Sequence, residues 1–295
     1  MARYQYRHRK PQRRKLRFSR ILTFLVLLLL LAYPFWEATH ITVAKRTVLV
    51  PSLAPNLKNM EIAYVTDIHQ GMFFSQARVN QLINQINALG ADIVILGGDY
   101  AENPAGAIAF FQNAPRIQAR LGVYGVLGAN DRSESEEDLN LLVGEMKTYG
   151  CIPLVNNVTR VKAGQTYVHI AGADDFTNGM PDIQDMASQV KQSDFVVFVA
   201  HDPDLLIPAF SAKSSDGDTH WFDLALFGQT HGGQITVFGR PLLPGFAPSS
   251  GLRYLTGWRE ENRAGILISN GIGTSVIPMR LFAQPQIHLM TLKAK

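Results

Sequence analysis

The chain has 295 residues, of which 46% are hydrophobic, and it carries charged residues of both signs, as expected for one globular domain with a short additional segment. Two large domains would not fit this length. Residues 1–20 contain nine of the 28 Lys and Arg residues and no acid, which leaves 19 basic and 24 acidic residues elsewhere. This basic tail runs directly into an apolar segment, so it indicates membrane topology, and we expect no nucleic-acid partner. The single cysteine, Cys151, excludes an intramolecular disulfide.

The first predicted elements are a basic cytoplasmic tail at residues 1–20 and a transmembrane anchor at residues 21–38. The apolar run from Ile21 to Trp36 is slightly short for a hydrocarbon core of about 30 Å, so flanking residues must share the interface. A cleaved signal peptide is the alternative, and Arg13-Arg14 is a weak match to a twin-arginine export signal. No clear small-x-small cleavage site follows, which favours an uncleaved anchor. The chain is then a single-pass protein of the cell (inner) membrane, with its domain on the periplasmic or extracellular side.

Residues 39–57 are predicted to be a connector with a short strand and a proline-broken loop, followed by one domain at residues 58–295. In this domain, apolar runs alternate with helical patterns such as Gln76 to Leu89, which indicates an α/β fold. The apolar runs span residues 62–65, 92–98, 122–128, 195–200 and 224–228. Residues 235–239 and 286–292 suggest further strands of a second sheet.

Each of the five apolar runs is followed by polar side chains. The carboxyl ends of strands in open α/β sheets face a shared crevice, so these side chains are expected to converge although they are distant in the sequence. They are Asp67 and His69, Asp99, Asn130 and Asp131, His201, and Gln229 with His231.

These residue types are suited to a metal site. Asp67 and His69 offer one hard oxygen and one imidazole nitrogen, a mixture that favours manganese, iron or zinc over calcium. Asp99 follows two glycines that allow a tight turn, and His231 precedes two glycines that leave space around a ligand. Any one of the histidines taken alone is more often a loop or core residue, but their order at successive strand ends favours a shared site.

The order D-x-H, G-G-D, G-x-x-D, A-H-x-P-D and G-x-T-H-G-G-Q resembles that of the calcineurin-like metallophosphoesterases, over roughly residues 58–293. The chain is most similar to a membrane-associated bacterial branch, some members of which act on phosphodiesters of lipid-linked sugars. The resemblance implies a four-layer α/β/β/α sandwich with a two-metal centre at the strand ends. It also implies that Asp67, His69 and His231 bind the first metal, that Asp99 bridges the two metals and that His201 binds the second.

The sequence departs from the family pattern around the second metal. The usual G-N-H-D is replaced by Gly128-Ala129-Asn130-Asp131, so an asparagine ligand is lost and Asn130 stands at the position of the catalytic histidine. Gln229 replaces a second-metal histidine and is a weaker ligand. Asp131 is expected either to steady this loop from behind the ligands or to serve simple turn chemistry.

Other polar residues have less specific expectations. Arg280 is a candidate contact for an anionic substrate, with a surface or structural ion pair as the alternative. The pair Asp174-Asp175 is expected to lie in a solvated loop. No role is assigned to the histidines outside the motifs, which are His40, His169, His220 and His288.

The sequence therefore favours a metal-dependent phosphoester hydrolase, a phosphodiesterase or phosphatase of reduced or restricted activity. Its cofactor would be one divalent ion of manganese, iron or zinc, with a second ion in doubt, and its substrate a phosphorylated small molecule or a lipid-linked molecule near the bilayer. The alternative is a catalytically inactive binding or regulatory module, favoured by Ala129, Asn130 and Gln229. A third hypothesis is a metal-stabilised scaffold with no phosphate ligand.

Overall fold

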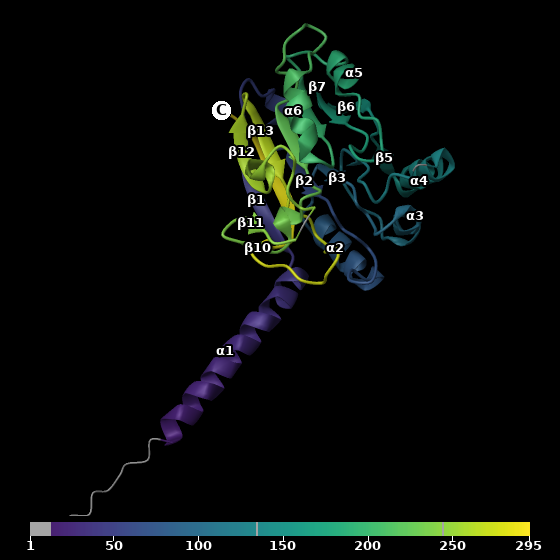
Figure 1. Ribbon diagram of the computed structural model, residues 1–295. Helices are drawn as coiled ribbons and strands as arrows, with labels where there is room; N and C mark the ends of the chain where they lie inside the picture. The colour runs from purple at the N-terminus through teal and green to yellow at the C-terminus, as the bar shows by residue number, and fades with distance from the viewer. Residues whose placement is uncertain (1–12, 134, 244) are drawn as a thin grey trace, which may run out of the picture.

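The structure is a computed structural model that describes residues 13–133, 135–243 and 245–295, so the first twelve residues of the predicted tail lie outside the described residues. A single helix, α1 (Arg13–Thr39), projects from one end of an α/β body (Figure 1). Its segment Arg20–Thr39 is long and apolar enough to cross a membrane, since 20 helical residues span about 30 Å. The structure thus agrees with the prediction of one N-terminal apolar helix.

The first of two six-stranded sheets has the order β1-β14-β2-β3-β4-β5. Strands β2, β3, β4 and β5 run parallel to one another, whereas β14 is antiparallel to β2 and parallel to β1. The bounds of these strands are β1 Thr42–Val50, β2 Glu61–Val65, β3 Ile93–Leu96, β4 Val123–Gly125, β5 Cys151–Pro153 and β14 Gln286–Ala294.

The second sheet has the order β12-β13-β9-β8-β7-β6 and a parallel centre formed by β13, β9, β8 and β7. Its strands are β6 Asn157–Ala163, β7 Thr166–Gly172, β8 Phe195–Val199, β9 Leu224–Phe227, β12 Gly257–Glu261 and β13 Ala264–Ile268. A separate two-stranded ribbon pairs β10 (Thr236–Val237) with β11 (Arg240–Pro241).

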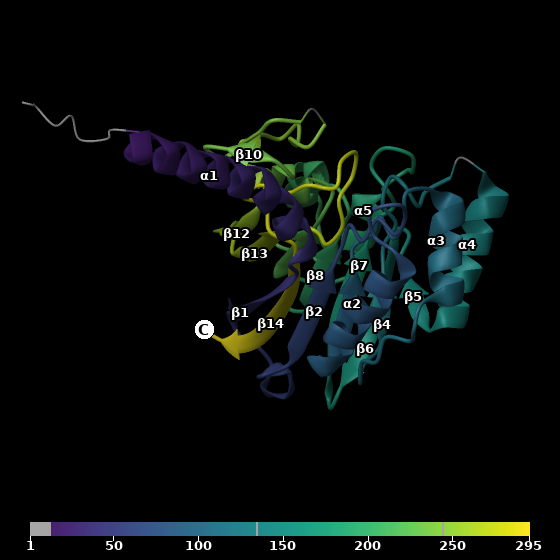
Figure 2. The same ribbon diagram turned by 90° about the horizontal axis from the view of Figure 1, so that it is seen from below.

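Alternation of side chains along the buried strands builds the four layers. On β2, Ile62 and Tyr64 face the second sheet, while Ala63 and Val65 face the helices, because successive residues of a strand point to opposite faces. The helices on that outer face are α2 (Gln76–Ala88), α3 (Pro104–Asn113) and α4 (Glu136–Tyr149), the last two side by side in Figure 2. Helices α5 (Ile183–Ser188) and α6 (Leu206–Ser211) cover the second sheet. The predicted α/β/β/α sandwich is therefore confirmed.

The strand expected within the connector is β1, an edge strand that pairs along its whole length with β14. Two other local expectations need correction. Strand β14 belongs to the first sheet, because its partners β1 and β2 lie far away in the sequence and a local pattern identifies a strand without assigning it to a sheet. Residues 236–241 form a local ribbon outside both large sheets, since β10 pairs with the adjacent strand β11.

His288, a buried residue of β14, makes the stability of the sheet sensitive to acid. Burial lowers its pKa to about 4, and its Nε2 lies 3.0 Å from the Ser269 hydroxyl. Because the unfolded chain binds the proton more readily, stability is complete above pH 6.5 and about 3 kcal/mol is lost as the pH falls from about 6.5 to about 4. Unfolding followed at pH 7.5 and pH 4.5 should show a smaller loss for His288→Gln than for the wild type. The exposed His40→Gln is the control, and equal losses in all three proteins would contradict this assignment.

Candidate metal centre

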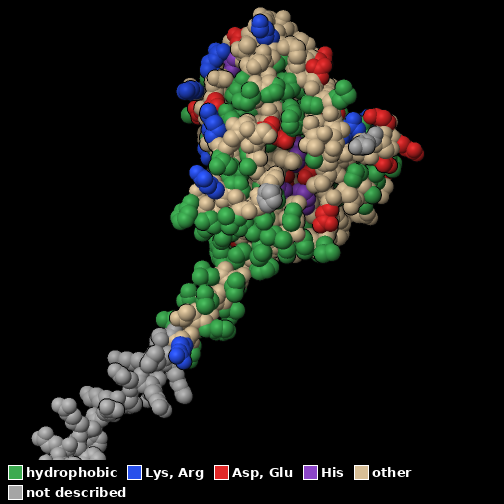
Figure 3. Space-filling view, in the orientation of Figure 1, with side chains coloured by type: hydrophobic (Ala, Val, Ile, Leu, Met, Phe, Trp, Pro, Cys, Tyr) green, Lys and Arg blue, Asp and Glu red, His purple; other side chains and the backbone are tan. Residues whose placement is uncertain are grey.

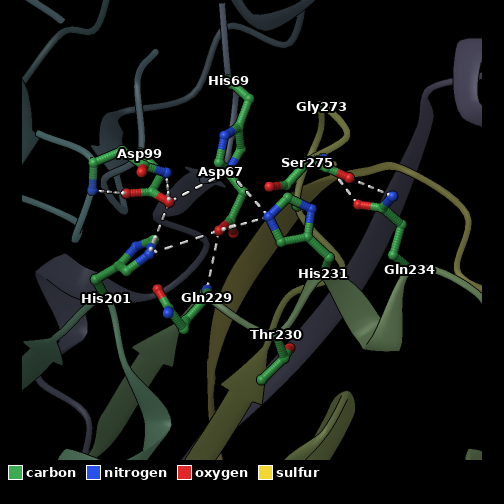
Figure 4. A network of polar contacts seen from close by, with 12 residues as sticks. Asp67, His69, Asp99, His201, Gln229, Thr230, His231, Gln234, Gly273 and Ser275 are labelled. Carbon is green, nitrogen blue, oxygen red and sulfur yellow. Dashed lines mark hydrogen bonds and ion pairs between the residues drawn. The ribbon is translucent and has the colours of Figure 1, made fainter. Parts of the chain in front are cut away.

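Loops at the carboxyl ends of β2, β3, β8 and β9 bring five predicted site residues together (Figure 4). The two sheets lie face to face, so the strand ends of both contribute to one end of the sandwich. All five side chains are almost completely buried, and they are Asp67, His69, Asp99, His201 and His231.

The donor atoms of these residues form two groups of three that share Asp67. In the first group, His231 Nε2 lies 3.0 Å from His69 Nε2 and 3.5 Å from Asp67 Oδ1. In the second, His201 Nε2 lies 3.5 Å from Asp99 Oδ2 and 3.8 Å from Asp67 Oδ1. Asp99 Oδ2 is also 3.3 Å from His69 Nε2, so this oxygen faces a histidine of each group.

The backbone at the site is held in an unusual conformation. Asp67, His69, Asp99 and His231 all have φ between 48° and 53°, and Gln229 has a φ of 67°. Residues other than glycine rarely adopt this left-handed region, and each such residue costs of order 1 kcal/mol or more. Five such residues converging on one point is a feature of functional sites, where the surrounding fold holds side chains in positions they would not choose themselves.

Two glycines permit the close approach of these loops. A Cβ at Gly128 would overlap the Asp99 carboxylate, and one at Gly228 would lie 2.6 Å from Asp67 Oδ2. Both positions therefore require a residue without a side chain, because neither carboxylate can withdraw into the packed core behind it.

The residues present fit a divalent metal. Asp67 Oδ2 and His201 Nε2 are buried and make no hydrogen bond with the residues that the structure describes. Buried polar atoms normally have partners, but His201 Nε2 lies 3.5 Å from Asp99 Oδ2 and 3.8 Å from Asp67 Oδ1 without a hydrogen bond to either, which indicates a missing ligand such as an ion between them. Donor separations of 3.0–3.5 Å in the first group match those of atoms that each lie about 2.1 Å from one ion. His201 Nδ1 lies 2.7 Å from the Gly97 carbonyl, which leaves Nε2 as the free donor.

The carboxylates and histidines shift one another's pKa. Burial favours the neutral form of His201, but the Asp99 and Asp67 carboxylates outweigh it and raise the pKa of His201 well above its usual range. The pKa of Asp99 moves well below its usual range, because His201 and His69 outweigh the effect of burial. Burial, His69 and Arg280 lower the pKa of His231 and keep it neutral, the form in which an imidazole binds metal.

Asp131 and Asn130 fix the Asp99 loop by hydrogen bonds to its backbone and to the Asp99 carboxylate. Asp131 accepts hydrogen bonds from the backbone N–H groups of Asp99, Tyr100 and Gly128 at 2.6–2.9 Å. Burial raises the pKa of Asp131 to about 7, with a further contribution from the Asp99 charge. Asn130 donates from its side chain to Asp99 Oδ2 at 2.8 Å and from its backbone to Oδ1. The loop around Asp131 is therefore fixed by its carboxylate, beyond what turn chemistry requires.

Gln229 lies at the site through its backbone as well as its side chain. Its backbone N–H donates to Asp67 Oδ1 at 3.0 Å, and its half-buried side chain lies beside His201 in Figure 4. The residue that replaces the usual histidine is thus near both His201 and Asp67.

Arg280 requires a correction. The sequence suggested a contact with an anionic substrate, but the side chain is fully buried behind His231. Its guanidinium donates to the carbonyls of Gly273, Asn270 and Ala283, and Nη2 lies 3.3 Å from His231 Nδ1. Arg280 therefore supports the loop beneath His231, because its donors are consumed by backbone carbonyls.

Replacing Arg280 by methionine should cost about 3–5 kcal/mol of unfolding free energy, because several buried carbonyls lose a charged donor at once. Chemical unfolding of the detergent-solubilised chain would measure this loss. The matched control is Arg253→Met, since Arg253 is mostly exposed and its ion pair with Glu261 should contribute less than about 1 kcal/mol. Equal losses in the two variants would show that the Arg280 contacts do not stabilise the fold.

Asp174 and Asp175 also differ from expectation, because both are buried and do not lie in a solvated loop. Asp174 Oδ1 lies 3.3 Å from Arg132 Nε, and Asp175 accepts from the backbone of Asn178 at 2.6 Å. Asn178 in turn donates to the Ala129 carbonyl at 2.9 Å, so this loop lies against the altered second half of the site. The signal that could have identified the pair is its place two residues beyond β7, the neighbour of β8 in the sheet.

Comparison with known proteins agrees with this geometry. The chain is 25% identical over 269 residues to the uncharacterized metallophosphoesterase YkuE of Bacillus subtilis strain 168, with 89% of each chain covered. It is 27% identical over 245 residues to the phosphodiesterase YaeI of Escherichia coli K12, covering 80% of this chain and 83% of YaeI. A transmembrane protein with metallophosphoesterase domain from Bos taurus is 26% identical over 271 residues, covering 85% of this chain and 57% of that protein.

The sequence profile of the calcineurin-like phosphoesterases matches residues 60–239. This match includes the loops after β2, β3, β8 and β9, and so contains all five clustered residues. Members of the family use divalent metals, and the two groups of donor atoms are consistent with that. The chain therefore belongs to the calcineurin-like phosphoesterase family.

Proposed function

We propose that this protein is a metal-dependent phosphoester hydrolase that acts at a membrane surface on a lipid-linked phosphodiester or phosphomonoester. The observation that carries the proposal is the pair of donor groups around Asp67, buried at the strand ends and built on left-handed backbone. A structural role alone would not explain five strained residues converging on unpaired donor atoms. The likeness to the phosphodiesterase YaeI supports a hydrolytic role.

In this proposal, Asp67, His69 and His231 would hold the first divalent ion of manganese, iron or zinc. Asp99 would serve both ions, and His201 would be the main ligand of the second, with Gln229 a weaker one. When bound, such ions neutralise charge on the phosphoryl oxygens and lower the pKa of water. The protein contributes position: Gly97 orients His201, and Arg280 supports the loop below His231.

The residues around the second position point to a slow or substrate-restricted enzyme. The side chain of Ala129 has no atom that can bind a metal. The Asn130 amide is directed at Asp99 Oδ2, where it cannot protonate a leaving group. Losing a general acid costs about 10²–10⁴ in rate, so turnover of a poor leaving group is expected to be slow. The same contact favours the second candidate, an inactive module that binds a phosphorylated ligand in the remaining groove.

The location of the protein is also part of the proposal. The basic residues 1–20, which precede the apolar part of α1, favour a single pass through the cell (inner) membrane with the domain on the periplasmic or extracellular side. The apolar helix and the transmembrane relative from Bos taurus support membrane association. An anchored enzyme meets a lipid-linked substrate at high effective concentration.

The deciding experiment is hydrolysis of a bis-aryl phosphate by the full chain in detergent micelles, with manganese and after removal of metal by a chelator. Hydrolysis that needs the metal, together with metal content measured by mass spectrometry, would support the proposal. Bound metal without hydrolysis, combined with calorimetric binding of a phosphorylated compound, would favour the inactive module.

A further inference from the structure

The carboxyl end of α1 is built into the domain. Glu37 is only 2% exposed, and its carboxylate accepts the backbone N–H groups of Phe282 and Ala283 at 3.2 and 2.9 Å. Arg78 donates to the Ala38 carbonyl at 3.1 Å and to the Phe73 carbonyl at 2.8 Å. The orientation of the domain relative to α1 is therefore set by hydrogen bonds from two separate segments of the domain, the loop at residues 282–283 and helix α2.

A further contact lies within the apolar part of α1. The backbone N–H of Arg280 donates to the Pro34 carbonyl at 2.9 Å, and Pro34 precedes the exposed aromatic residues Phe35 and Trp36. Aromatic residues at the end of an apolar helix mark the water–lipid boundary. The loop that contains Arg280 therefore reaches the level of this boundary when α1 spans a bilayer.

Loops around the joint, as we call the contact between the end of α1 and the domain at Pro34, Glu37 and Ala38, expose large apolar side chains. We call them the apolar collar, and they are between 61% and 100% exposed: Met72, Phe238, Leu242, Val276 and Phe282. Figure 3 shows hydrophobic side chains gathered over this end of the body beside α1, with histidines and acids immediately above them. A water-facing surface rarely groups such side chains at the tips of several loops.

The collar is connected to the metal centre by short segments. Gly273 donates its N–H to the Asp67 carbonyl at 2.7 Å, and the same loop continues to Val276 and Phe282. Leu242 precedes Phe246, whose ring packs edge-on against His231 with centroids 5.3 Å apart. The collar therefore borders the site.

We propose that the apolar collar inserts into the phospholipid bilayer crossed by α1, so that the site opens at the lipid surface and receives a phosphoester that remains in the membrane. Lipid is the occupant that the collar fits because the collar is continuous with α1. The helix that crosses the bilayer accepts hydrogen bonds from the backbone of Arg280 and Phe282, and Leu281 between them accepts from Thr236, two residues before Phe238. Insertion of the collar requires only that α1 spans the membrane, whereas delivery of a membrane-bound phosphoester to the site rests on the proposed function.

The test places a fluorescent reporter at single cysteines in the full chain, reconstituted into phosphatidylcholine vesicles, in a Cys151→Ala background. Phe238→Cys and Phe282→Cys report on the collar. The matched control is Leu49→Cys, which is 51% exposed and lies near the other end of β1, seven residues or about 23 Å beyond Thr42. Lipids with a spin label near the headgroup quench a reporter that enters the bilayer.

We expect about threefold stronger quenching at positions 238 and 282 than at position 49, since inserted apolar groups reach about 5–10 Å into the interface. Equal quenching at all three positions would overturn the proposal. It would also be overturned by a blue-shifted, unquenched reporter at position 238 whose emission depends on the protein-to-lipid ratio, because that result would identify a second copy of the chain as the occupant.

A second measurement separates docking from catalysis. The double variant Phe238→Ser and Phe282→Ser should hydrolyse a soluble bis-aryl phosphate at the wild-type rate, but a vesicle-embedded phosphodiester about tenfold more slowly, because two inserted aromatic groups are lost. Equal slowing on both substrates, or no slowing on either, would contradict membrane delivery of the substrate. If the protein hydrolyses neither substrate, the proposed function fails while the quenching result still decides the docking surface.

Discussion

Asp99→Asn will lower metal-dependent phosphodiester hydrolysis at least about 10³-fold, because the variant removes the carboxylate that faces a histidine of each donor group. An amide oxygen carries no full negative charge, so two ions close together would repel each other without compensation. The measurement is steady-state turnover with manganese, combined with the number of ions bound per chain. We expect bound metal to fall together with the rate.

The matched control for this variant is Asp216→Asn, since Asp216 is an exposed carboxylate in a turn near the amino end of β8, whereas the metal centre lies at the carboxyl ends of the strands. It should retain wild-type turnover and metal content. Wild-type rates in Asp99→Asn, with the metal still bound, would remove Asp99 from the catalytic centre and favour a site that uses the first ion alone.

The double variant Ala129→Asn and Asn130→His should increase turnover about 10²-fold or more, because it rebuilds both a metal ligand and a proton donor in the loop after β4. The wild-type residues are half-buried, which leaves space for larger side chains. Asp131 remains in place to hold the loop through its three backbone hydrogen bonds. Turnover of a substrate with a poor leaving group is the most sensitive measurement, since such a substrate depends most on protonation.

The single variants separate the two contributions to this gain. Ala129→Asn alone should raise the affinity for the second ion, whereas Asn130→His alone should raise the rate mainly at saturating metal. Full occupancy of both positions in the double variant without measurable hydrolysis would favour the inactive module.

Much of the site was predictable because its chemistry is local in the sequence. Asp67, His69 and Asp99 follow short apolar strands directly, so a strand assignment and the convergence of parallel strand ends suffice to group them. The left-handed backbone at these residues was not predictable, since aspartate and histidine adopt it more often than most residues but still in only a small fraction of cases. It arises because the fold around the site determines where each carboxylate and imidazole must point.

Residues whose role depends on distant packing were predicted less well. Arg280 ends a run with glycines, Thr274, Ser275 and a proline that is typical of a loop, yet its guanidinium donates to carbonyls of residues 231, 270, 273 and 283. Asp174 and Asp175 look like a solvated turn until Arg132 and Asn178 are placed beside them. Pairing of β1 with β14 joins the two ends of the domain, a contact that no local pattern contains.

The joint at Glu37 determines where the chain can be divided. A soluble fragment that begins within β1 would shorten the edge strand beside β14, and one that begins at residue 42 would still lack Glu37. The backbone N–H groups of Phe282 and Ala283 would then lose their acceptor, at a cost of about 1–3 kcal/mol for each group that stays buried. The last turn of α1 thus serves as a structural part of the domain, and a protease or an expression design that removes the helix would also loosen the loop beneath His231.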